Sequence, residues 1–177
     1  LQKALVSLET GFSGLDRVLD LNKKQIEKKL KENIPNKLLV VAEAIRKKVN
    51  LKRIFALSKI DPWFLEQIKE IVDTETMIKK KGLPKDFVEF NRIKSIGFSD
   101  RKLSELSKTS EEIVRRKRTA LKILPVFKKV DTCAAEFKSF TPYMYSTYQR
   151  NFSINSECEA DPSTKKKIII LGGGPNR

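Results

Sequence analysis

The sequence predicts a mainly α-helical protein, built as an irregular bundle of about seven short helices. Three observations favour this fold class. The 177 residues include only seven glycines, apolar residues recur at helical spacing through most of the chain, and few runs alternate with the period of two that strands require. The length suits one hydrophobic core with short appendages. An apolar content of 40% and a charged content of 33% are typical of a globular protein.

The clearest helix is expected over residues 61–81. Asp61 can cap its start, Pro62 suits the first helical position, and Gly82 stops it. Its apolar residues recur on one face, and they are Phe64, Leu65, Ile68, Ile71, Val72 and Ile78. Trp63 stands at the start of this helix, and we expect it to be a core anchor, because a lone aromatic residue on an apolar face usually packs.

Three shorter helices are expected before this one. A very basic helix over residues 23–31 carries Ile26 and Leu30 on one side. Pro35 opens the next helix, which is apolar nearly all round and should therefore be the buried one. Asn50 can cap a brief third helix.

Three more helices are expected after Gly82. Pro84 starts the first, which Gly97 closes, and Ser99 caps the second. Residues 109–112 (TSEE) fit the capping-box pattern, in which the last glutamate reaches back to the free amides, and they lead into a helix that ends before Pro125.

From residue 125 onward the helical pattern is lost, and residues 130–148 follow neither a 3.6 nor a 2.0 period. We expect an irregular strap whose aromatic side chains cover the bundle or neighbouring domains. These aromatic residues are Phe137, Phe140, Tyr143, Tyr145 and Tyr148. Residues 150–165 are polar and contain Pro162, as expected of a linker. A terminal apolar strand and a glycine-rich loop follow, and they predict the opening of an α/β unit that belongs to the next domain. The chain is therefore expected to be a piece of a larger enzyme.

Several functional classes are excluded by composition. The chain has no histidine, which rules out histidine-dependent catalytic triads and removes the commonest zinc ligand. Cys133 and Cys158 form no Cys-x-x-Cys pair, and we expect reduced thiols. We therefore expect no catalytic residue and no metal site. No stretch approaches the ~20 apolar residues that span a bilayer, and no signal-peptide pattern opens the chain, so we expect a cytoplasmic protein.

The net charge of +15 leaves one alternative open. Residues 99–119 have the spacing of a helix-turn-helix, whose second helix would offer basic side chains to nucleic acid. These side chains are Arg115, Arg116, Lys117 and Arg118. Against this hypothesis, the turn has no glycine, and consecutive basic residues point around a helix instead of along one face. A solvated, lysine-rich surface explains the charge more simply, and a nucleic-acid partner is not expected.

Five motifs, in this order, give the chain a family resemblance. They are residues 58–68 (SKIDPWFLEQI), 129–137 (KVDTCAAEF), 143–148 (YMYSTY), 157–160 (ECEA) and 171–177 (LGGGPNR). Together they resemble the middle of the large subunit of carbamoyl-phosphate synthase. The resemblance runs from Leu1 to Arg177.

The resemblance implies a division into four parts. Residues 1–10 would be the tail of the first ATP-grasp half, and residues 11–149 the helical oligomerisation domain. Residues 150–165 would be a linker, and residues 166–177 the start of the second ATP-grasp half. The loop at that end would border the second half's site and the carbamate passage, and its residues are Gly172, Gly173, Gly174, Asn176 and Arg177.

The resemblance also implies what the whole enzyme does. It is an ATP-dependent ligase that joins bicarbonate, glutamine-derived ammonia and two ATP into carbamoyl phosphate for pyrimidine and arginine biosynthesis. ATP, with Mg or K ions, would bind in the flanking halves, and a glutamine amidotransferase small subunit would be a partner. For this chain we expect no cofactor and a scaffold role, with self-association as a twofold dimer through the early helices near Ile26 and Leu30.

Overall fold

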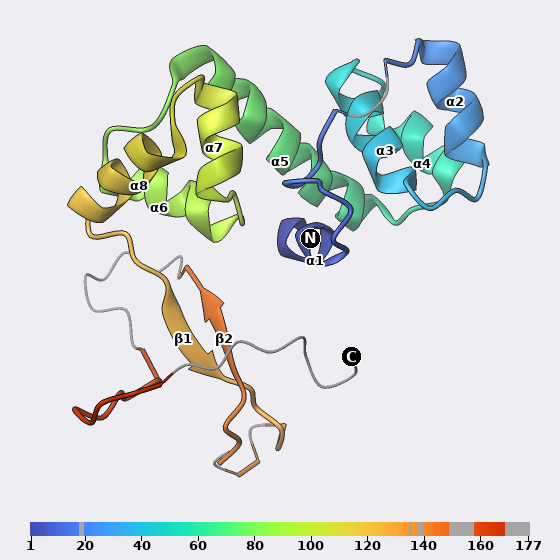
Figure 1. Ribbon diagram of the computed structural model, residues 1–177. Helices are drawn as coiled ribbons and strands as arrows, with labels where there is room; N and C mark the ends of the chain where they lie inside the picture. The colour runs from blue at the N-terminus through green and yellow to red at the C-terminus, as the bar shows by residue number, and fades with distance from the viewer. Residues whose placement is uncertain (18–19, 135, 138–139, 149–157, 169–177) are drawn as a thin grey trace.

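The computed structural model describes residues 1–17, 20–134, 136–137, 140–148 and 158–168. These residues form eight α-helices and a two-stranded antiparallel sheet, which confirms the mainly helical fold. The helices gather into two lobes at the two ends of the long helix α5, and the sheet projects from the second lobe (Figure 1).

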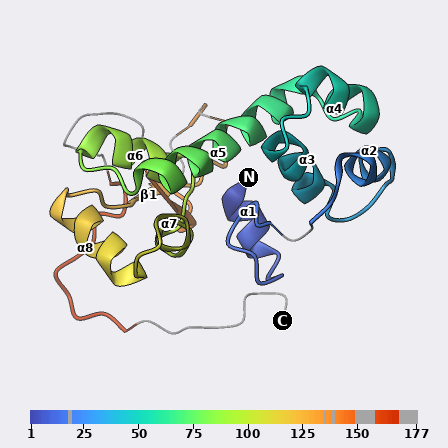
Figure 2. The same ribbon diagram turned by 90° about the horizontal axis from the view of Figure 1, so that it is seen from above.

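The bounds of the helices follow the expected order along the chain. The first lobe contains α2 (Lys23–Lys31), α3 (Lys37–Arg46) and α4 (Leu51–Ser58). The second lobe contains α6 (Phe87–Ser95), α7 (Asp100–Ser107) and α8 (Glu111–Ala120). Helix α5 (Pro62–Lys81) joins the lobes, and α1 (Gln2–Ser7) lies between them beside α5 (Figure 2).

Helix α5 begins and ends where the sequence predicts. The Asp61 side chain accepts a hydrogen bond of 2.8 Å from the backbone amide of Trp63, and Pro62 occupies the first helical position. Gly82 ends the helix with a φ of 76°, which a residue with a side chain rarely adopts. At 20 residues the helix is about 30 Å long, enough to run through both lobes.

The cap at Asp61 gives a first prediction. Asp61→Ala removes the acceptor for the Trp63 amide, and we expect the free energy of unfolding to fall by about 1 kcal/mol. Asp61→Asn keeps an acceptor at the same place and should stay close to the unaltered chain. Urea denaturation followed by circular dichroism compares the two variants. Equal losses for both variants would contradict a capping role.

Helix α3 is the buried helix that its composition predicts. All residues from Leu39 to Ile45 are buried, and α3 contacts α2, α4 and α5. One of these buried residues is Glu43, whose side chain is 4% exposed. A carboxylate on a helix that is otherwise apolar needs a partner in the interior.

Three helix starts differ from the prediction. Helix α3 starts after Asn36, because Pro35 lies in a turn in which the amide of Lys37 donates to the carbonyl of Ile34. Helix α6 starts after Asp86 and not at Pro84, because the Asp86 side chain caps it.

The start of α8 is the third difference. Ser110 caps this helix by accepting from the amide of Ile113, which is the third helical residue. Isoleucine cannot return a hydrogen bond, so the predicted capping box was wrong.

Part of the predicted strap forms a sheet. Strands β1 (Val126–Lys129) and β2 (Met144–Thr147) pair antiparallel, with Val126 opposite Thr147. Each strand has only four residues, too few to show a period of two in the sequence. Tyr148 packs against the core, whereas Phe140 is 87% exposed and Phe137 is also exposed. Tyr148 therefore covers the bundle as predicted, and the expected cover of the other aromatic side chains by neighbouring domains stays a prediction.

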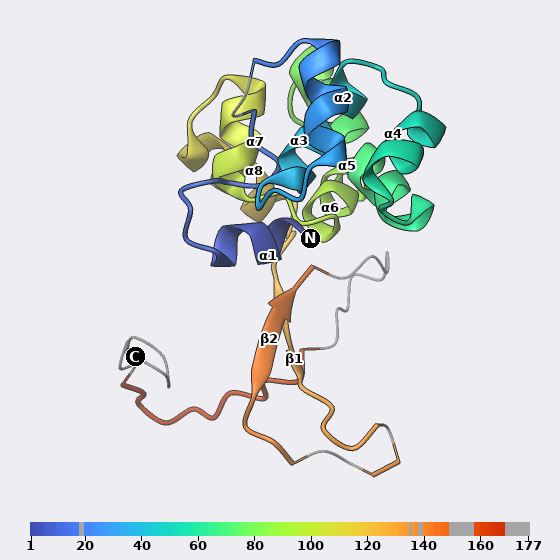
Figure 3. The same cartoon turned by 90° about the vertical axis from the view of Figure 1, so that its right-hand side faces the viewer.

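One residue of the predicted linker, Glu159, is bonded to β1, and the chain then runs away from the sheet (Figure 3). The backbone amide of Glu159 donates to the carbonyl of Phe127 at 2.8 Å, and its carboxylate accepts from the amide of Lys129 at 2.7 Å. The Lys128 ammonium lies 3.1 Å from the same carboxylate. The predicted glycine-rich loop, with Gly172, Gly173, Gly174, Asn176 and Arg177, lies outside the described residues.

Candidate functional site: a buried charge cluster and an exposed groove

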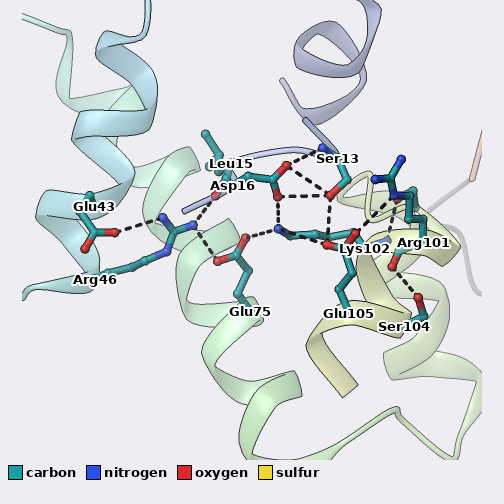
Figure 4. Close-up of polar contacts among 11 residues, drawn as sticks. Ser13, Leu15, Asp16, Glu43, Arg46, Glu75, Arg101, Lys102, Ser104 and Glu105 are labelled. Atoms are coloured by element: carbon teal, nitrogen blue, oxygen red, sulfur yellow. Dashed lines mark hydrogen bonds and ion pairs between the residues drawn. The ribbon is translucent and has the colours of Figure 1, made fainter. Parts of the chain in front are cut away.

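A cluster of charged side chains lies between the two lobes (Figure 4). Its acidic members are Asp16, from the loop after α1, Glu43 of α3 and Glu75 of α5. Its buried cations are Arg46 of α3 and Lys102 of α7, and the more exposed Arg17 and Lys47 also pair with Glu43, at 3.3 and 4.0 Å. The cluster thus collects groups from four separate segments of the chain.

Arg46 ties the first lobe to α5. One of its guanidinium nitrogens donates to Glu75 at 2.8 Å and also to the backbone carbonyl of Leu15. The other terminal nitrogen lies 3.6 Å from the Glu43 carboxylate. Both carboxylates are 4% exposed, so water can stabilise neither of them well.

Lys102 makes the corresponding link from the second lobe. Its ammonium donates to Asp16 and lies 3.9 Å from Glu75. Burial raises the pKa of Asp16, but the hydrogen bonds from Lys102 and from the amide of Ser13 outweigh it, so that this pKa lies below its ordinary value. Because Glu75 lies between Arg46 and Lys102, the cluster fixes how the two lobes sit on α5.

A second polar group anchors the sheet to the helices. Lys94 of α6 donates to Asp100 at 2.8 Å, and Arg118 of α8 donates to the same carboxylate at 3.1 Å. The ring of Tyr148 lies 4.9 Å from the Lys94 ammonium and 5.9 Å from the Arg118 guanidinium carbon. These are cation–π distances, so the end of β2 is held against the second lobe.

Burial and hydrogen bonds shift the pKa values of this group in different directions. Burial lowers the pKa of Lys94 and raises that of Tyr148. Burial also raises the pKa of Asp100, but hydrogen bonds from Lys94 and Arg118 outweigh it, and the pKa of Asp100 lies below its ordinary value.

The lowered pKa of Asp100 predicts a dependence of stability on pH. A carboxyl group with a lower pKa in the folded chain stabilises the fold above its unfolded pKa, which is about 3.9. That stabilisation is lost as the pH falls through the folded pKa. We expect Asp100→Asn to be less stable at pH 7 and to lose less stability than the unaltered chain between about pH 5 and pH 2, where aspartate side chains titrate. Urea denaturation at a series of pH values measures both effects, and an unchanged acid profile would contradict this role.

The basic residues of α8 do not form one nucleic-acid-binding face. Arg118 is turned inward to Asp100 and to the carbonyl of Ile123. Arg115 pairs with Glu111 on its own helix, while Arg116 and Lys117 are exposed. The alternative hypothesis of a helix-turn-helix gains no support from this geometry.

The predicted interface residues are in the core. Ile26 and Leu30 are both 0% exposed, on the side of α2 that packs in the first lobe, where α2 contacts α3 and α4. A core stripe and an interface stripe have the same helical spacing in a sequence, so the spacing alone cannot separate them. Self-association through the early helices stays a prediction, and it would have to use the exposed side of α2.

Trp63 is not the core anchor that the sequence predicts. It is 62% exposed, and the next residue, Phe64, is 56% exposed. The continuous buried stripe of α5 begins only at Leu65, so the first turn carries both rings at the surface. They border a groove of about 620 Å³. The prediction for Trp63 was therefore wrong.

The described residues form neither a cluster of metal ligands nor a membrane-spanning helix. No group of three or more His, Cys, Asp or Glu gathers there to hold a metal ion, and both cysteines are free. No helix in this part of the chain combines the length and the apolar character needed to cross a bilayer.

Comparisons with known proteins identify the family. The family model for the oligomerisation domain of the carbamoyl-phosphate synthetase large chain matches residues 1–122. The carbamoyl phosphate synthase large chains of Brucella melitensis and Haemophilus ducreyi are 45% and 46% identical over 100% of this chain. That of Xanthomonas campestris is 47% identical over the same share. The chain spans 16% of the length of each of these relatives. The boundaries expected at residues 10, 149 and 165 are not tested by the match and stay predictions. The chain belongs to the family of the carbamoyl-phosphate synthetase large-chain oligomerisation domain.

Proposed function

We propose that this chain is the self-associating helical scaffold of a carbamoyl phosphate synthase large chain. The observation that carries the proposal is the match of residues 1–122 to the oligomerisation domain of that family. The charge cluster supports it physically. A scaffold must hold a fixed shape, and the ion pairs of Arg46 and Lys102 oppose movement of one lobe against the other.

The proposal assigns the chemistry to the rest of the large chain. The whole protein would join bicarbonate, glutamine-derived ammonia and two ATP into carbamoyl phosphate in the cytoplasm, for pyrimidine and arginine biosynthesis. Two ATP-grasp halves would bind ATP with Mg or K ions, and a glutamine amidotransferase small subunit would supply the ammonia. The described residues gather no group of side chains that could hold a metal ion, and the proposal therefore places the metal ions and the chemical steps in the flanking halves.

The scaffold role is tested by nucleotide turnover. The purified 177-residue chain should release no phosphate from ATP in the presence of magnesium, potassium and bicarbonate. The full-length large chain, supplied with ammonia, should consume ATP under the same conditions. Turnover by the 177-residue chain that persists through repeated purification would contradict the scaffold role.

The proposed dimer is expected to depend on salt if its interface is on α2. The exposed side of this helix is basic, with side chains contributed by Lys23, Lys24, Lys28 and Lys31. A twofold contact would bring like charges together, so added salt should strengthen association by screening them. Charge reversal by Lys24→Glu should reduce this salt effect. If the interface lies elsewhere, Lys24→Glu should leave the association and its dependence on salt unchanged.

A further inference from the structure

Two large aromatic rings are held at the surface by the first turn of α5. The rings of Trp63 and Phe64 meet edge to face, with centroids 4.9 Å apart and planes at 86°. They form one side of the groove, and its other lining residues include the apolar side chains of Leu38 in α3, Ile71 further along α5 and Ile96 at the end of α6. An apolar hollow bordered by exposed aromatic rings is typical of a surface that another polypeptide covers.

Leu1 lies on the rim of the same groove and is half exposed. Helix α1 begins there, since the amide of Leu5 donates to the carbonyl of Leu1 at 3.0 Å. No side chain caps this helix start, because leucine has no hydrogen-bond acceptor in its side chain. The views from above and from the side place this end of α1 close to α5 (Figures 2 and 3). A polypeptide attached to the amino group of Leu1 would therefore enter the groove directly.

We infer that this groove is the docking surface for the polypeptide that precedes Leu1 in the full-length large chain. The inference rests on the proposed function, in which the first ATP-grasp half comes before this chain, and on relatives of which this chain spans only 16%. The occupant is an apolar segment of that half, which covers Trp63 and Phe64. The groove thereby fixes the first half on the scaffold.

A second copy of the chain is the competing occupant. An attached segment meets the groove at an effective concentration on the order of millimolar, which exceeds the concentration of a second copy in dilute solution. Because Leu1 already forms part of the rim, a second copy would also have to share the groove with the preceding residues. The attached segment is therefore favoured.

Hydroxyl-radical footprinting with mass spectrometry tests the inference, since it measures the exposure of single side chains. The 177-residue chain and the full-length large chain are oxidised under the same conditions. We expect oxidation of Trp63 to be slower in the full-length protein by about tenfold, because burial removes the ring from solvent. Phe55 of α4, an exposed aromatic residue that does not line the groove, is the control and should keep its rate. Equal rates for Trp63 in the two proteins would overturn the inference.

Dilution distinguishes an attached segment from a second copy as the occupant of the groove. Protection by an attached segment should not change with protein concentration, whereas protection by a second copy should disappear as the assembly dissociates. Loss of Trp63 protection on dilution would overturn the inference in favour of a second copy. Sedimentation of the same full-length samples measures their oligomeric state, so that a failure of the docking inference can be distinguished from a failure of the proposed self-association. A monomer with protected Trp63 refutes self-association alone, and an oligomer with unprotected Trp63 refutes docking alone.

Discussion

Replacing Arg46 with methionine is expected to lower the free energy of unfolding by about 3–5 kcal/mol, the usual cost of removing one partner from a buried ion pair. The substitution leaves Glu43 and Glu75, each 4% exposed, without the cation between them. It also removes the hydrogen bond to the carbonyl of Leu15. Urea denaturation measures the loss as a lower midpoint with an unchanged slope.

Two further variants separate charge from geometry at this site. Arg46→Lys keeps the positive charge but cannot contact Glu75, Glu43 and the Leu15 carbonyl together. Its stability should therefore lie between that of the unaltered chain and that of Arg46→Met. Arg53→Met is the control, because Arg53 pairs with Glu27 at the surface, where an ion pair contributes little. If Arg46→Met were no less stable than Arg53→Met, the cluster would not hold the lobes.

Replacing Ile26 with glutamate is expected to cost about 4 kcal/mol or more, because it places an unpaired carboxylate in the core. Ile26 is 0% exposed, at the face of α2 that packs inside the first lobe. Thermal unfolding followed by circular dichroism should show a much lower midpoint or no cooperative transition.

Lys24→Glu is the matched control on the exposed side of α2, and it should unfold close to the unaltered chain. The pair of variants separates folding from association. A folded, monomeric Ile26→Glu chain would mean that Ile26 lies in an interface between copies, and it would contradict the buried position.

The helices could be predicted because their signals are local. Asp61, Pro62 and Gly82 determine the ends of α5 through contacts within a few residues, and Asn50 caps α4 in the same way by accepting from Lys52. The apolar run of α3 likewise predicted its burial. The resemblance to the family, confirmed by the comparisons, depended on short motifs spread along the whole chain.

The charge cluster could not be predicted because its partners are distant in the sequence. Lys102 meets Asp16 across 86 positions, and no local pattern records that contact. One signal was present, since Glu43 stands inside an apolar helix and such a carboxylate needs a buried cation. The exposure of Trp63 was missed for a related reason. An aromatic residue on a docking surface has the same sequence pattern as an aromatic residue in the core.

Sedimentation equilibrium of the 177-residue chain tests the scaffold account most directly. With rising concentration the weight-average mass should increase from 20.3 kDa toward twice that value, as expected for a twofold dimer. The measurement should be repeated with Trp63→Ala, which removes association through the exposed groove. A mass that stays at 20.3 kDa over the whole concentration range, or one that rises only while Trp63 is present, would contradict self-association as the function of this domain.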